Sequence, residues 1–130
     1  MACWGNDNGY HNKPDGQTKP PPGSYTEVSA AFYGSCGLRQ GGNIACWGDQ
    51  APPPRGRFVQ ISATFSWFGQ EGIVCGLRPY HQVQCGRGVP AMPGYREVSD
   101  LFPNICGITV NSGVRCTGEL GTLTFPAAAP

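Results

Sequence analysis

Cysteines are the residues of this sequence that are best suited to chemistry, and six of the seven occur in regularly spaced pairs. Ten positions separate the members of each pair, which are Cys36 and Cys46, Cys75 and Cys85, and Cys106 and Cys116. A zinc site would need ligand pairs only a few residues apart, and the sequence has none. The repeated spacing therefore predicts three disulfide-closed hairpins, with reduced and buried thiols as the alternative. Because disulfides persist in oxidising compartments, we expect a secreted or extracellular protein.

Other chemistry finds little support in the sequence. His11 and His81 lie in polar stretches, "GYHNKPDG" and "RPYHQVQ", where exposure at the surface is expected. No Gly-x-Ser-x-Gly elbow, His-Glu-x-x-His pair or phosphate-binding loop occurs. The segment "NDNGYHNKPDG" has the composition of a calcium loop but not the ligand order or terminal Glu of an EF-hand, so turn-forming residues explain it more simply. We expect a protein that is not an enzyme and uses neither a metal nor a cofactor.

The composition indicates one folded domain over residues 1–130. Gly (20) and Pro (13) are abundant, while 39% of the residues are hydrophobic. A disordered chain would be poorer in apolar residues, so these values favour many short strands joined by turns. The formal net charge of +1 is too balanced for a nucleic-acid backbone binder, and no apolar stretch is long enough to insert into a membrane. The first ten residues also lack the basic start and apolar run of a signal peptide.

The chain repeats itself around the cysteine pairs. Units at about 25–49, 58–88 and 95–119 each open with an aromatic residue and continue to Val-Ser or Ile-Ser. The second unit carries a six-residue insertion between Ile61 and Cys75. The connectors "PPPGSY", "PPPRGRF", "PAMPGY" and "TFPAAAP" are predicted to be loops outside the strands, because proline restricts the backbone and lacks an N–H donor.

Each unit is predicted to contain three short antiparallel strands, so the protein is all-β. In the first unit these strands are Glu27–Ala31, Gly34–Arg39 and Asn43–Trp47. The segment "CGLRQGGNIAC" predicts a hairpin because its glycines permit positive φ. Cysteines that face each other across such a hairpin would have Cα atoms about 4.5–5.5 Å apart, which suits a disulfide.

The order Val-Ser-Ala, Cys-Gly-Leu-Arg, Gly turn and Ala-Cys-Trp-Gly resembles the repeats of the regulator-of-chromosome-condensation superfamily. The resemblance covers about residues 2–119 and is closest to the cysteine-bearing extracellular variants. It weakens at Cys85–Arg87 and Cys116–Gly118, and the family's usual His is replaced by Gly34 and Asn104. The resemblance implies a β-propeller whose blades are the three repeat units.

Three blades are too few to close a ring, because propellers use about four to eight. A repeat also buries its apolar face only against its neighbours. We therefore expect a homo-oligomer, most simply a dimer whose six blades complete one ring. A fragment of a longer chain and a compact monomer without propeller geometry are the alternatives.

The N-terminal "ACWG" at residues 2–5 recurs within "NIACWGD" at residues 43–49. We predict that it is the last strand of an incomplete unit, and that Trp4 and Trp47 pack between neighbouring strands. In an oligomer this strand is expected to add to a blade edge of another copy. Cys3 has no partner at the repeat spacing, which favours a free thiol over a bridge to Cys3 of a second copy.

Aromatic side chains provide the candidate binding site. The insertion "TFSWFGQEG" places Trp67 and Phe68 in a segment that the other units lack, and inserted loops often carry function. Trp and Tyr rings stack on the apolar faces of sugars, and polar side chains bind sugar hydroxyls. The predicted ligand-binding residues are Tyr10, His11, Tyr33, Trp67, Phe68, Tyr80 and His81. The first hypothesis is thus a lectin that binds glycans, although Trp67 and Phe68 could instead cover a core or an oligomer contact.

The second hypothesis is a protein-binding module. It follows from the family resemblance, because members of the superfamily bind enzymes, receptors or small GTPases. Binding to a glycan array that free sugar abolishes would favour the lectin. Capture of one protein partner, indifferent to sugars, would favour the module.

Overall fold

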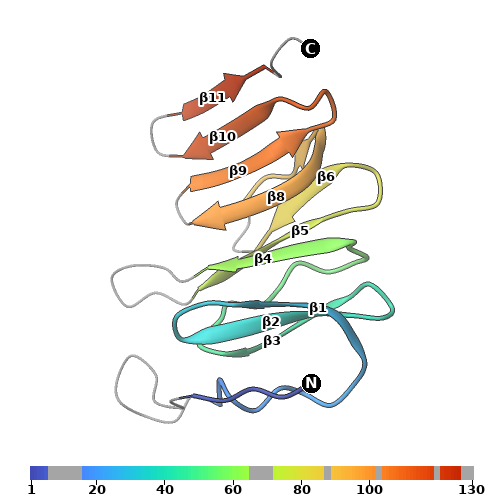
Figure 1. Cartoon of the computed structure of the whole chain (residues 1–130), viewed down its shortest axis with the longest axis vertical. Coiled ribbons are helices and arrows are strands. Elements are labelled where there is room, and N and C mark those ends of the chain that lie inside the picture. The colour runs from blue at the N-terminus through green and yellow to red at the C-terminus, as the bar shows by residue number, and fades with distance from the viewer. Residues whose placement is uncertain (6–15, 65–71, 87–88, 102–103, 119–120, 127–130) are drawn as a thin grey trace.

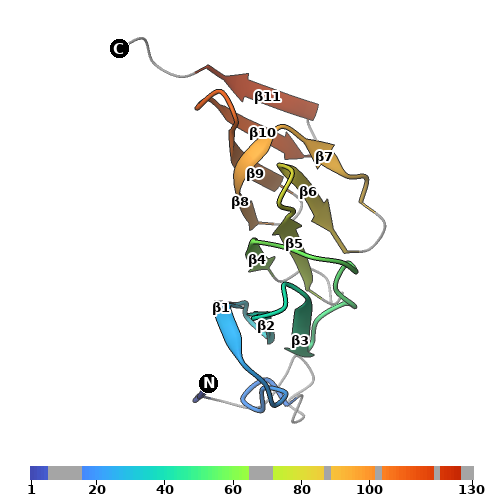
Figure 2. The ribbon, with the colours of Figure 1, turned by 90° about the vertical axis from the view of Figure 1, so that its right-hand side faces the viewer.

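All the named secondary-structure elements of the described residues are β-strands, which form three antiparallel sheets (Figure 1). A computed structural model describes residues 1–5, 16–64, 72–86, 89–101, 104–118 and 121–126. The three sheets follow one another along the long axis of the molecule, in chain order (Figures 1 and 2). Within those residues, no helix has the length and apolar character needed to span a membrane. The predicted all-β class and the three blades are therefore confirmed.

Each sheet is a meander in which neighbours in the chain are neighbours in the sheet. The first blade contains β1 (Tyr25–Ala30), β2 (Gly34–Arg39) and β3 (Ile44–Gly48). The second blade contains β4 (Gln60–Thr64), β5 (Ile73–Leu77), β6 (Gln82–Cys85) and β7 (Met92–Pro93). The third blade contains β8 (Tyr95–Leu101), β9 (Asn104–Thr109), β10 (Val114–Gly118) and β11 (Gly121–Phe125).

The second and third blades each have a fourth strand that the sequence did not predict. β7 lies within the connector "PAMPGY", and β11 ends with the first two residues of "TFPAAAP". Pro93 pairs with Gln82 in β7, which is the edge strand of its sheet. Proline is tolerated there because no further strand needs a hydrogen bond from the N–H that it lacks. The prediction that connectors lie outside the strands is wrong at these two places.

The three predicted disulfides are present and close the central hairpin of each blade. Cys36 lies directly opposite Cys46, and the other pairs have the same register, Cys75 with Cys85 and Cys106 with Cys116. In each pair the Cα atoms are 4.0 Å apart, which is closer than expected. Cys3 forms no disulfide.

The two tryptophans of the repeated Cys-Trp-Gly have different environments. Trp47 is buried, packs edge-on against Tyr25, and donates a hydrogen bond from Nε1 to the carbonyl of Gln17 at 2.9 Å. Trp4 is 88% exposed, and residues 1–5 form no strand. The prediction of a packed Trp is confirmed for Trp47 and wrong for Trp4, which lines a cleft opposite β1 instead of packing between strands.

An arginine clasp holds the opening aromatic residue of every unit. In each unit a guanidinium group lies over an aromatic ring. The distances from Cζ to the ring centroid are 5.2 Å for Arg39 over Tyr25, 4.6 Å for Arg78 over Phe58 and 5.3 Å for Arg115 over Tyr95. Each arginine also donates a hydrogen bond to a connector carbonyl, at Pro22, Arg55 and Pro93 respectively. The clasp therefore fastens each Pro-rich connector to the blade that follows it.

The aromatic ring of each clasp rests on the glycine that follows the first cysteine of its unit. A Cβ atom on Gly76 would collide with the ring of Phe58, which is buried and covered by Arg78. We expect Gly76→Ala to lower the free energy of unfolding by about 1–3 kcal/mol, the usual cost of overpacking a core.

Urea titration of Gly76→Ala beside Gly41→Ala provides the measurement. At Gly41 an added Cβ would have its nearest neighbour, Asn43 Oδ1, at 3.7 Å, so we expect a change of less than about 0.5 kcal/mol. Equal stability of the two variants would contradict the packing assigned to Phe58.

Candidate functional site

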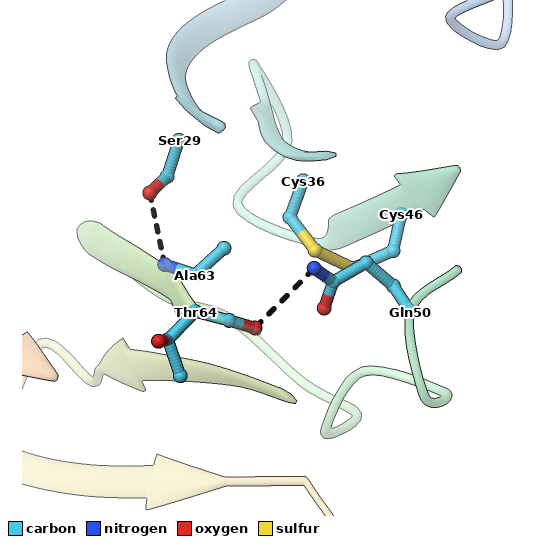
Figure 3. The surroundings of a disulfide bond; sticks show 6 residues. All are labelled: Ser29, Cys36, Cys46, Gln50, Ala63 and Thr64. Atoms are coloured by element: carbon cyan, nitrogen blue, oxygen red, sulfur yellow. Dashed lines mark hydrogen bonds between the residues drawn. A yellow bond between two sulfur atoms is a disulfide. The ribbon is translucent and has the colours of Figure 1, made fainter. Parts of the chain in front are cut away.

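Side chains of one blade bind the backbone of the next blade. Ser29 Oγ on β1 accepts a hydrogen bond from the N–H of Ala63 on β4 at 2.8 Å (Figure 3). Two positions earlier, Glu27 Oε1 accepts one from the N–H of Ile61 at 3.1 Å. The first and second blades are thus joined by two side chains that bind alternate N–H groups of one strand.

The second and third blades are joined at the same repeat positions. Gln60 Oε1 accepts a hydrogen bond from the N–H of Val98 at 3.0 Å, and Gln60 Nε2 donates one to the Val98 carbonyl at 3.2 Å. Ser62 Oγ accepts from the N–H of Asp100 at 3.1 Å. The blade junction is therefore a repeated structural unit.

Each junction also has an apolar half. Ile61 belongs to a buried cluster with Leu38 and Ile44, and the Cys36–Cys46 disulfide of the first blade packs in the same cluster. Val98 occupies the equivalent place, in a cluster with Cys75, Leu77, Val83 and Cys85 of the second blade. Both branched side chains are only 3% exposed, so the disulfide face of one blade is covered by the first strand of the next.

The first blade leaves its side of this junction uncovered. Val28 holds the repeat position of Ile61 and Val98, but it is 53% exposed. Phe32 is 66% exposed nearby, and Val28, Ala30 and Phe32 together form what we call the first-blade face. A cleft of about 340 Å³ separates this face from residues 1–4. The first strand of the second and third blades is buried at the internal junctions, whereas the equivalent surface of the first blade is open.

The third blade leaves the opposite side uncovered. Val114 is 41% exposed, whereas its equivalents Ile44 and Val83 are 8% and 0% exposed. A hollow of about 180 Å³ has a mainly apolar lining, to which Ile108 and Val114 contribute together with other residues of the sheet. Its rim includes the junction positions Glu97 and Ser99, and both residues are exposed. These residues form what we call the third-blade face.

The structure does not bring together the three predicted sugar-binding residues that it describes. Tyr33 precedes β2, whereas Tyr80 and His81 follow β5, and β2 and β5 hold equivalent places in their blades. These side chains therefore lie at opposite ends of the strands. His81 adopts a φ of 65° in the hairpin turn, and its Nδ1 lies 3.2 Å from the Tyr95 carbonyl. The other predicted residues, Tyr10, His11, Trp67 and Phe68, lie outside the described residues.

Asp100 is an unusual group that the sequence reasoning missed. Both of its carboxylate oxygens are buried without a hydrogen-bond partner. Burial raises the pKa of Asp100 to about 7, and the nearby Ser62 hydroxyl and the backbone N–H offset this only in part. The repeat contained a signal, because Ala30 and Ala63 hold the same position in the other blades. In the described ranges, no three His, Cys, Asp or Glu residues gather to hold a metal.

Solved propeller structures share this fold. The CRINKLY WD40 ectodomain from the Arabidopsis thaliana receptor kinase ACR4 is 23% identical, with a TM-score of 0.62 over 98% of this chain and 44% of that one. The entire ectodomain from the Physcomitrella patens receptor kinase CR4 is 22% identical, with a TM-score of 0.66 over 90% of this chain and 33% of that one. This chain thus spans less than half the length of either structure. No protein-family model and no curated protein matches the sequence.

Proposed function

We propose that this chain is a non-enzymatic protein-interaction module and that the first-blade face is its contact surface. The exposure of Val28 carries the proposal, because the same position is buried against another blade at both internal junctions. Phe32 and Trp4 extend the apolar surface on the two walls of the adjoining cleft. Exposed apolar groups gathered in this way mark contact sites on soluble proteins.

Two further observations support this proposal. The solved structures with the same fold are receptor kinase ectodomains. The sequence of the repeats also resembles the regulator-of-chromosome-condensation superfamily, whose members bind proteins. Three disulfides and the extracellular setting of those ectodomains also support an extracellular location for this chain. Under this proposal the chain needs no catalytic residues.

The lectin hypothesis receives less support. Sugar binding requires aromatic and polar side chains that converge on one ligand, whereas Tyr33 lies at one end of the strands and Tyr80 and His81 lie at the other. The apolar first-blade face is better suited to a protein surface than to a hydroxyl-rich sugar.

A photo-cross-linking residue at position 32 tests the proposal. Irradiation in an extracellular extract should produce a protein adduct at position 32, whereas the same residue at position 59 should produce none. Val59 is also exposed but directly precedes β4 in the second blade, which lies between the first and third blades. The adduct is then identified by mass spectrometry, and the purified partner is titrated against the chain.

We expect Phe32→Glu to weaken the binding of that partner by at least about 30-fold, because the proposal places this side chain at the centre of the contact. Val59→Glu should leave the affinity unchanged, and free sugars should not compete. Glycan binding that depends on Tyr80, together with no protein adduct at position 32, would overturn the proposal in favour of the lectin.

A further inference from the structure

We infer that the partner of the first-blade face is the third-blade face of a second copy of this chain, in a head-to-tail contact. The inference rests on the proposed function and names the partner. Both halves of the internal blade junction are present at the two open faces, and the chain already forms this junction twice at the same repeat positions. The faces are therefore complementary to each other.

The hydrogen-bonding half of the junction is available. Val28 and Ala30 have the same register against β2 as Ile61 and Ala63 have against β5, so their N–H groups point away from the sheet. Their acceptors in a second copy would be Glu97 and Ser99, which correspond to Glu27 and Ser29 at the first junction. Each open face thus presents the groups that the other face requires.

The apolar half is also available. Ile108 and Val114 are paired across β9 and β10 as Leu38 and Ile44 are across β2 and β3. At the first junction the latter pair packs with Ile61, whereas the described residues that line the hollow of about 180 Å³ all belong to the third blade itself. Val28 of a second copy would supply the matching branched side chain and would become buried in turn.

A head-to-tail contact has a geometric consequence. Each copy uses its first-blade face in one contact and its third-blade face in another. The contact therefore repeats from copy to copy until the rotation between copies closes a ring. Two copies contribute six blades, which is within the range of about four to eight that propellers use. Residues 1–4 border the cleft beside Val28, but they pair with no strand in the described part of the chain. They are therefore expected to move aside when the contact forms.

Light scattering of the complete chain over a range of concentrations tests the inference. The wild-type protein should reach at least twice the 13.8 kDa of one chain. Val28→Glu removes the apolar side chain of the first-blade face, and Val114→Glu places a charge in the hollow of the third-blade face. Each variant alone should weaken association by at least about 30-fold, whereas Val59→Glu should behave as wild type.

A mixture of the two variants provides the sharper result. The Val28→Glu copy retains an intact third-blade face, and the Val114→Glu copy retains an intact first-blade face. An equimolar mixture should therefore recover a two-copy species that neither variant forms alone, which also shows that both variants are folded. A chain lacking residues 1–4 should still associate.

Other outcomes overturn the inference. A wild-type chain that stays monomeric at every concentration excludes the second copy as partner. Association that survives in both variants, or a mixture that recovers nothing, excludes this contact. Loss of association on removal of residues 1–4 would assign the contact to exchange of the N-terminal segment. If the chain stays monomeric while a protein still cross-links at position 32, the proposed function stands and only the identity of the partner is wrong.

Discussion

Replacing Cys75 and Cys85 together by alanine is expected to lower the free energy of unfolding by about 3–5 kcal/mol. Closing a ten-residue separation contributes about 2.7 kcal/mol in the chain-entropy model. The remainder comes from packing, because both sulfurs lie in the buried cluster that receives Val98 of the next blade. Urea unfolding under non-reducing conditions measures the loss.

The chain offers its own matched control for this effect. Cys106 and Cys116 close a hairpin of the same length, but they are only half-buried in the third blade. Replacing both by alanine should therefore lower the free energy of unfolding by about 2–3 kcal/mol, since the chain-entropy contribution is the same for both disulfides and the packing contribution is smaller for this one. Both pairs are compared in a Val28→Glu background, in which the inferred head-to-tail contact is not expected to form, so that the third-blade face stays open. Equal losses for the two pairs would contradict the packing contribution assigned to the second disulfide.

Asp100 is expected to make the protein less stable as the pH rises from about 4 to about 7.5. Its pKa is raised from 3.8 to about 7, so between these values the folded protein keeps a proton that the unfolded chain has lost. The contribution of Asp100 to the free energy of unfolding is therefore fully present below about pH 4, and it is lost as the pH rises through about 7. The shift corresponds to at most about 4 kcal/mol.

Asp100→Ala isolates this effect, because alanine is the residue that the other two blades have at this position. The variant should be more stable than wild type at pH 7.5, and the difference should shrink towards pH 4. Unfolding titrations of both proteins across this range provide the measurement, and the other carboxyl groups cancel in the difference. Parallel pH profiles would show that the Asp100 carboxyl is hydrated in the folded protein.

Much of the fold was predictable from the sequence because it depends on local patterns. The spacing of Cys36 and Cys46 places them opposite each other in a hairpin, and the recurrence of that spacing identifies three blades. The strand Gly34–Arg39 was predicted with its observed bounds. Pairing across a short turn involves only neighbours in the chain, which explains why these predictions are confirmed.

Contacts between distant segments were less predictable. The arginine clasp joins Arg115 to the carbonyl of Pro93, and the blade junction joins Gln60 to Val98, 38 positions away. In the sequence Gln60 and Arg115 are ordinary polar side chains, and Arg115 does not hold the repeat position of Arg39 and Arg78. Trp4 shares its Cys-Trp-Gly motif with Trp47 but lies at the surface, because residues 1–5 are not part of a sheet in which a neighbouring strand could cover the ring.

The all-β class, the three repeats and the disulfide pairing can be read from the amino-acid sequence, since each follows from periodic spacing within a short stretch of chain. The place of the candidate site depends instead on how the blades pack. Val28, Ile61 and Val98 are equivalent in the repeat, yet Val28 is exposed and the other two are buried. Burial depends on the neighbour that covers a residue and not on the residue itself, so a repeated sequence specifies identical faces, and stacking of the blades determines which of them stay open.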